Sequence, residues 1–130
     1  MEAIDKTIPI EGSITGRLVM DLKVLVLSEI DELDKAKRLQ GLLKTAGFEA
    51  RVRPILGNDF TPDVILSVGI RTLIVDAMEV DCHRSGIPVF RYKDNLINKF
   101  DKGFKPREVF WRDDDLILGL RAHQVERVVL

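Results

Sequence analysis

The chain has 130 residues, of which 45% are hydrophobic and 32% charged, and its formal net charge is -1. This length and balance indicate one globular domain that can bury its own core, and they exclude a disordered chain. A net charge so close to zero provides no overall field that would attract nucleic acid or an anionic membrane, so neither is an expected partner.

The compartment can be predicted from three further features. The longest apolar run, Val24–Leu27, is too short to cross a bilayer, and the acidic first twelve residues lack the apolar core of a secretory signal. A lone cysteine, Cys82, excludes an internal disulfide framework, and we therefore expect a cytoplasmic protein.

Glutamine occurs only twice, whereas Glu, Lys and Arg are frequent. This bias in composition is the basis for the hypothesis of a heat-adapted source.

Residues 1–20 are predicted to form an N-terminal arm, and residues 21–130 a single α/β domain. The arm contains Pro9, Gly12 and Gly16, which interrupt any regular element. A flexible arm, an edge strand and a segment exchanged between subunits remain alternatives.

The first predicted strand is the continuous apolar run Val24–Leu27, as expected for a strand covered on both faces. Apolar residues recur every three or four positions from Asp31 to Ala46, which predicts a helix that Gly47 ends. Apolar and charged residues then alternate from Phe48 to Val52 and predict a second, partly exposed strand.

The next segment has two interpretations. Thr61-Pro62-Asp63 has the cap, proline and acid of a helix start, so a helix is predicted through Val68, with Gly69 as its stop. Thr72–Val75 would then be a buried strand ending at Asp76. In the alternative, Val64–Leu66 is the strand.

The second half continues the alternation of helix and strand. Its predicted elements are a short helix Ala77–Ser85, a strand Ile87–Phe90 with Pro88 at its start or edge, a short helix or loop Asp94–Lys99, a strand Glu108–Trp111 and a helix from Asp113 to Val128. About five strand-then-helix segments in succession predict an open parallel sheet with helices on both faces, in a flavodoxin-like arrangement. Such a sheet places its functional groups at the carboxyl ends of its strands.

Acidic side chains dominate the predicted strand ends. Glu29 and Asp31 follow the first strand, Asp76 ends the third, and Lys93 follows the fourth as a candidate anion-binding residue. In the flavodoxin-like order the first and third strands are neighbours, so the three carboxylates would converge. They could bind Mg²⁺ or raise one another's pKa for acid–base chemistry. Alternatively, they only stabilise the N-terminal ends of the following helices.

The chain also resembles the receiver domain of response regulators over residues 22–130. The matching pieces are KVLVLSEIDELDKAKRLQGLLKTAGFEARV, GIPVFRY, KPREVFWRDDDLILGLRAH and Asp76 after a buried strand. The resemblance implies Glu29 and Asp31 as magnesium ligands, Asp76 as phosphoacceptor and Lys105, before Pro106, as the lysine of the receiver site.

Three features depart from the receiver pattern. Ile30 separates the two acids, Arg91 and Tyr92 stand where a small hydroxyl residue is expected, and Lys105 precedes the fifth strand. The expectation is therefore a degenerate receiver that no longer accepts phosphate, or a flavodoxin-like protein unrelated to receivers.

Two other groups of residues have a functional and a structural interpretation. Cations alternate with aromatic residues between Lys102 and Arg112, and aromatic rings beside cations can bind single-stranded nucleic acid. In the structural interpretation Phe104, Phe110 and Trp111 belong to the core, or Trp111 lies at a subunit interface. Cys82 and His83 are adjacent and would point apart on a helix, so Cys82 is expected in the core and His83 at the surface.

The sequence lacks the dinucleotide fingerprint, the phosphate-binding loop, the usual zinc-site patterns and the serine-hydrolase elbow. The leading hypothesis is a non-catalytic regulatory or binding domain for a protein partner or a small anionic ligand, with Asp76, Lys93 and Lys105 at the site. The alternatives are a small Mg²⁺-dependent enzyme acting on a phosphate-containing substrate, and a structural protein that self-associates, with a homodimer expected.

Overall fold

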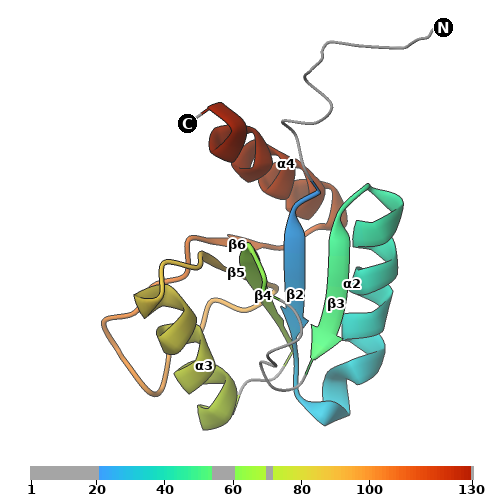
Figure 1. Ribbon diagram of the computed structural model, residues 1–130. Coiled ribbons are helices and arrows are strands. Elements are labelled where there is room, and N and C mark those ends of the chain that lie inside the picture. The colour runs from blue at the N-terminus through green and yellow to red at the C-terminus, as the bar shows by residue number, and fades with distance from the viewer. Residues whose placement is uncertain (1–20, 54–60, 70–71, 130) are drawn as a thin grey trace, which may run out of the picture.

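The computed structural model describes residues 21–53, 61–69 and 72–129 (Figure 1). In chain order the elements are β2 (Lys23–Leu27), the 3-10 turn η1 (Ile30–Glu32), α2 (Leu33–Thr45), β3 (Glu49–Arg53), β4 (Val64–Val68), α3 (Leu73–Arg84), β5 (Val89–Tyr92), β6 (Glu108–Phe110) and α4 (Asp113–Val129). The predicted N-terminal arm, residues 1–20, lies outside these ranges.

The strands form one parallel sheet of five strands, in the order β3-β2-β4-β5-β6, within the described ranges. This confirms the predicted α/β class and the flavodoxin-like order. The first and third described strands are neighbours, with Val24 opposite Val64 and Leu27 opposite Ser67. Their carboxyl ends, where the order of strands reverses, lie at the edge where such sheets bind ligands.

Helices cover both faces of the sheet (Figure 1). Because successive strand residues point to opposite faces, Val24 and Val26 pack with α2 and α4, whereas Leu25 and Leu27 pack with α3. On the first face Leu39 and Leu43 of α2 and Leu116 and Leu120 of α4 are buried; on the second, Val75 and Val80 of α3 are buried. The sequence therefore builds two apolar layers around one sheet.

The predicted helix at 61–68 and the predicted strand at 72–75 are both wrong. Residues Val64–Val68 form the central strand β4 and are buried at every position. Asp63 precedes this strand and pairs with Lys23 through both its backbone amide and its side chain, at 2.8 and 2.9 Å. The local cap pattern was overridden because β4 pairs with β2 on one side and with β5 on the other.

The true start of α3 is at Thr72, whose hydroxyl accepts a hydrogen bond from the Val75 amide at 3.4 Å. Gly69, with a positive φ of 80°, ends the preceding strand. Asp76 therefore lies in the first turn of α3 and does not end a strand. This placement changes which groups can surround it.

The remaining elements differ from the predictions in their boundaries. Arg91 and Tyr92, predicted in a loop, are the last two residues of β5, and Pro88 directly precedes that strand as predicted. Residues 94–99 contain no helix. None of the described helices has both the length and the apolar composition needed to cross a bilayer.

Candidate functional site

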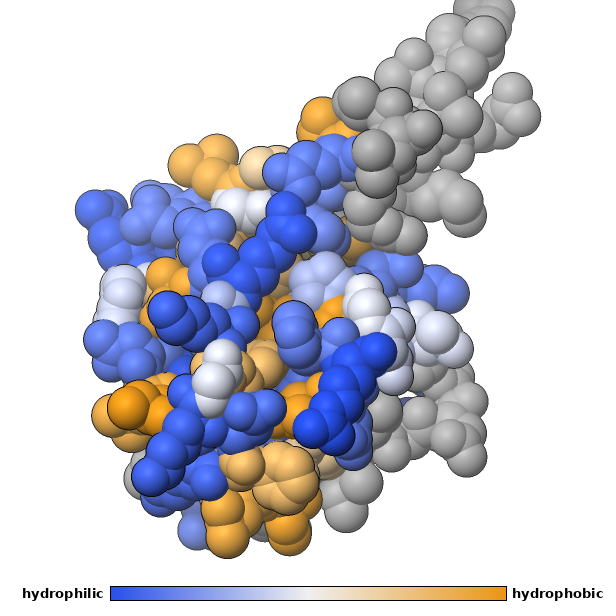
Figure 2. Space-filling model, turned by 90° about the vertical axis from the view of Figure 1, so that its left-hand side faces the viewer, coloured by the Kyte–Doolittle hydropathy of each residue, from blue (hydrophilic) through white to orange (hydrophobic). Residues whose placement is uncertain are grey.

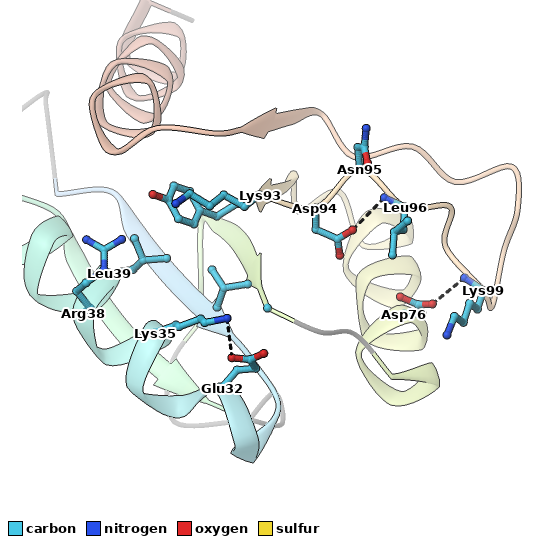
Figure 3. A pocket seen from close by; sticks show the side chains of 13 residues that line it. Glu32, Lys35, Arg38, Leu39, Asp76, Lys93, Asp94, Asn95, Leu96 and Lys99 are labelled. Atoms are coloured by element: carbon cyan, nitrogen blue, oxygen red, sulfur yellow. Dashed lines mark hydrogen bonds and ion pairs between the residues drawn. The ribbon is translucent and has the colours of Figure 1, made fainter.

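A hollow of about 750 Å³ opens at the carboxyl ends of β4 and β5 (Figure 3). One wall is α2, which together with the preceding η1 supplies Glu32, Lys35, Arg38 and Leu39, and the opposite wall is the loop after β5 together with the first turn of α3. This volume suits a small organic molecule. The hollow lies where the fold is expected to bind ligands.

Four cations line this hollow, and two of them form ion pairs across or beside it. Lys35 pairs with Glu32 at 3.1 Å, and Arg38 pairs with Asp113 at 3.0 Å. The Lys93 ammonium lies 5.2 Å from the centre of the Tyr92 ring, and the Lys99 ammonium has no ion pair with any described residue. The Lys93 ammonium likewise has no ion pair with any described residue. Lys93 and Lys99 are therefore the cations of this hollow that are most available to an anion.

The backbone of Lys93 has an unusual conformation. Its φ is +61°, the only positive value at a residue other than glycine in the described ranges. The Lys93 amide donates to the Phe110 carbonyl at 2.7 Å, which holds this conformation at the end of β5. Such strain costs about 1–3 kcal/mol and occurs preferentially at functional sites. The conformation therefore supports a role for Lys93 beyond that of a surface charge.

The carboxylates in the hollow shape its loop wall. Asp76 is buried, and its Oδ2 accepts a hydrogen bond from the Lys99 amide at 2.7 Å. Asp94 Oδ1 accepts one from the Leu96 amide at 2.9 Å, which forms a local turn. Figure 3 shows both bonds along the wall opposite α2. The two acids thus hold the backbone of the loop in place.

A buried polar network fastens the same loop to α3. Arg91 of β5 and Glu79 of α3 form a two-pronged ion pair at 2.9 and 3.1 Å, with their side chains 1% and 0% exposed. The Arg91 guanidinium also donates to the Leu96 carbonyl. The Asn98 amide donates to Glu79 Oε1 and to the Asp76 carbonyl, each at 3.0 Å. The network fixes the wall that carries the candidate lysines.

A second cluster joins three elements at the rim of the hollow. Arg38 donates two hydrogen bonds to Asp113, at 3.0 and 3.2 Å, and the Tyr92 hydroxyl donates to the same carboxylate. The guanidinium, followed by the hydroxyl, lowers the pKa of Asp113. Burial and then the bond to Asp113 raise the pKa of Tyr92, and the bond to Asp113 raises the pKa of Arg38. The cluster ties the first turn of α4 to α2 and β5.

The structure brings together only part of the predicted site. Asp76 and Lys93 line the hollow, whereas Glu29, Asp31 and Lys105 do not. Glu29 accepts a hydrogen bond from the Thr72 hydroxyl at 2.5 Å, and Asp31 is exposed on η1. Lys105 is exposed and precedes β6, so it lies on the side where that strand begins.

The magnesium prediction gains no support from this geometry. No group of three His, Cys, Asp or Glu side chains that could hold a metal ion occurs among the residues that the structure describes. Two of the three acids predicted as a magnesium site instead have separate local roles. Glu29 stabilises the start of α3 through Thr72, and Asp76 holds Lys99.

The basic and aromatic stretch divides between core and surface. Phe104 and Phe110 are buried, as the structural interpretation predicts, but Trp111 is 52% exposed. Trp111 and Arg112 line a second, more open hollow of about 380 Å³. That hollow shares Arg38, Tyr92 and Lys93 with the first one, so the two adjoin.

The adjacent residues Cys82 and His83 behave as predicted. Cys82 is buried, and burial raises the pKa of its thiol to about 11. His83 is exposed and packs edge-on against Phe104, with 5.4 Å between the ring centres. The pair therefore has no arrangement for nucleophilic catalysis.

Sequence reasoning missed Glu79 and Asn98, which hold the loop wall. The only sequence signal for Glu79 was a charged residue within an apolar helix segment, and no sequence signal pointed to Asn98.

The chain as a whole matches no protein-family model and no curated protein.

Proposed function

We propose that the protein is a non-catalytic binding domain that holds a small organic anion in the hollow at the carboxyl ends of β4 and β5. The proposal rests on the position of Lys93, a cation with a strained backbone that lines the hollow of about 750 Å³. Lys99 adds a second available charge on the same loop. Leu39, Val68 and Leu96 supply apolar surface for the organic part of the ligand.

The acids in the hollow support binding more than catalysis. Asp76 and Asp94 accept hydrogen bonds from loop amides, and Glu32 pairs with Lys35. Groups that hold the backbone in this way preorganise a binding site, because their own positions are set before the ligand arrives.

A regulatory role through binding is also part of the proposal. In receivers the phosphoacceptor follows the third strand, but β4 ends at Val68, and Asp76 lies on α3. The receiver-like lysine, Lys105, precedes β6 instead of following it. These placements support a regulator that responds to a bound molecule over one that transfers a phosphoryl group.

The test is thermal unfolding with a panel of inorganic phosphate, citrate, ribose 5-phosphate and AMP. A ligand at about 100 times its Kd should add about 2.7 kcal/mol to the stability of the native state. Lys93→Asn removes the charge but keeps a residue that tolerates positive φ, so this variant should fold normally and lose the stabilisation. Lys105→Asn makes the same change of charge outside both hollows and should retain it.

Two outcomes contradict the proposal. One is the absence of stabilisation by every anion in the panel. The other is an equal loss of binding in the Lys93 and Lys105 variants, which would show a diffuse charge effect instead of a site.

A separate observation favours self-association as a second candidate function. Leu73 and Ile74 of α3 and Leu96, Ile97 and Phe100 of the facing loop are 56–67% exposed. The loop contacts α3 next to these residues, because Asn98 and Lys99 both bind Asp76. Figure 2 shows apolar surface gathered toward the lower end of the face that carries α3. We name these five residues the apolar face.

The apolar face suits a second copy of the chain. Five large side chains exposed by more than half offer roughly 500 Å², against about 800 Å² per partner in an interface of standard size. Sedimentation of the protein should show a dimer that Ile97→Ser weakens, whereas Leu118→Ser, an exposed site on α4, should leave it intact. A monomer at all concentrations would refute this candidate.

A further inference from the structure

The second hollow contains the chain's only tryptophan. Trp111 directly follows β6 and is 52% exposed beside Arg112, while its neighbour Phe110 is buried. An exposed aromatic ring next to cations can stack on the planar ring of a ligand. A single exposed apolar residue would need no explanation, but here the ring lines the same hollow as Lys93, whose strained backbone independently marks this region.

The charges around the second hollow limit the charge of the ligand. Arg38 is engaged by Asp113 through two hydrogen bonds. Arg112 approaches Asp114 only to 4.0 Å, and both side chains are largely exposed, so this pair is weak. Lys93 and Arg112 are therefore the two cations of the second hollow that can bind an anion, and the carboxylates of Asp113 and Asp114 lie in the same hollow and would repel one. Two cations beside two carboxylates suit a single phosphate and disfavour the larger negative charge of a triphosphate.

From this arrangement we infer that the ligand is a nucleoside monophosphate, with its base stacked on Trp111 and its phosphate bound by Lys93 and Arg112. The inference rests on the proposed function for the anion site at Lys93, specifies the class of its ligand and places the base of that ligand in the adjoining second hollow. Lys93 lines both hollows, so the phosphate would lie at their boundary, and the sugar, which links it to the base, would lie between Lys93 and Trp111 in the second hollow.

The sole tryptophan makes the stacking directly measurable. Selective excitation of tryptophan reports on Trp111 alone, because the chain contains one Trp. AMP and GMP should quench this fluorescence with saturation, and ATP should bind no more tightly than AMP. Ribose 5-phosphate, which lacks a base, should bind in calorimetry without quenching.

Two substitutions separate stacking from a structural effect. Trp111→Leu should weaken AMP binding in calorimetry by about 5- to 150-fold, the range expected from loss of one stacked base. The same variant should leave the affinity for ribose 5-phosphate unchanged. Trp111→Phe keeps an aromatic ring and should retain most of the affinity for AMP.

The outcomes distinguish this inference from the proposed function. If AMP binds in a Lys93-dependent way but neither quenches Trp111 nor responds to Trp111→Leu, the base does not stack there and the inference is wrong, while the proposed function stands. If neither AMP nor any other anion of the panel binds, both are wrong. Saturable quenching by AMP that Trp111→Leu weakens would support both.

Discussion

Arg91 and Glu79 are joined by two hydrogen bonds inside the protein, with the Arg91 side chain 1% exposed and the Glu79 side chain fully buried. Arg91 is on β5 and Glu79 on α3, so the pair connects the sheet to the helix beneath the loop that carries Lys93 and Lys99. Phe104 adds a contact to the guanidinium, 5.8 Å from its ring centre. The position of the candidate site therefore depends on a buried charge pair that does not itself line the hollow.

Removal of one partner of this pair should be strongly destabilising. Glu79→Leu leaves the Arg91 charge buried and the Asn98 amide without one acceptor, so we expect a loss of about 3–5 kcal/mol in the free energy of unfolding by urea. The double variant Glu79→Leu/Arg91→Met should recover much of this loss, because no charge stays buried. Additive effects of the two substitutions would contradict a coupled pair.

Two helical glycines should respond oppositely to alanine. A methyl group added to Gly41 in α2 would meet only open space, so Gly41→Ala should stabilise the protein by about 0.5–1 kcal/mol. A methyl group on Gly119 in α4 would overlap the Phe110 ring, which stacks on Phe90 at 5.7 Å and cannot retreat freely. Gly119→Ala should therefore cost about 1–3 kcal/mol. Thermal unfolding of both variants measures the contrast, and a stabilised Gly119 variant would refute the close packing.

The pH dependence of stability should reflect Asp113. Its pKa is lowered in the folded protein, so its contribution is present above the unfolded pKa of about 4 and is lost as the pH falls through the folded pKa. At neutral pH, Asp113→Asn should cost about 0.5–1 kcal/mol, because the carboxylate is 39% exposed. The difference from the unmodified protein should shrink below about pH 4. Asp115→Asn, in the same exposed turn, is the control for helix-end charge.

Tyr92 is the only tyrosine, so its ionisation can be followed by ultraviolet absorbance without interference from another phenol. Burial and Asp113 raise its pKa, and we expect a midpoint above the usual value of about 10. Asp113→Asn removes a contribution that raises the pKa and leaves Arg38, which lowers it, so the midpoint should fall. An unchanged midpoint would show that Tyr92 and Asp113 are not coupled in solution.

Cys82 should be inert in the native protein. With its pKa raised to about 11, its thiolate fraction near neutral pH is about 100-fold below that of an ordinary thiol, and burial blocks access as well. A thiol reagent should therefore react slowly until denaturant unfolds the chain, when one equivalent reacts rapidly. Fast reaction under native conditions would contradict the buried position.

The candidate site was predictable only in part. Lys93 and Asp76 were found because they follow apolar segments near strand ends, although Asp76 was assigned to the wrong element. The roles of Glu79 and Asn98, and the placing of Trp111 in one hollow with Lys93, were not, because each depends on segments that are distant in the sequence. Glu79 binds Arg91 and Asn98, and Trp111 lines the same hollow as Lys93. No local spacing encodes such pairs.

The apolar periodicity by itself determined the α/β class, the parallel sheet, the helix α2 and the helix α4, since each buries a repeating face that can be counted along the chain. Only the tertiary structure decided that Val64–Val68 is a strand and that Thr72 starts a helix. Both segments are short and apolar, with cap-like residues before them, so local preferences do not separate them. Pairing of β4 with β2 and β5 on its two sides decides the matter, because a central strand satisfies its backbone only through those neighbours.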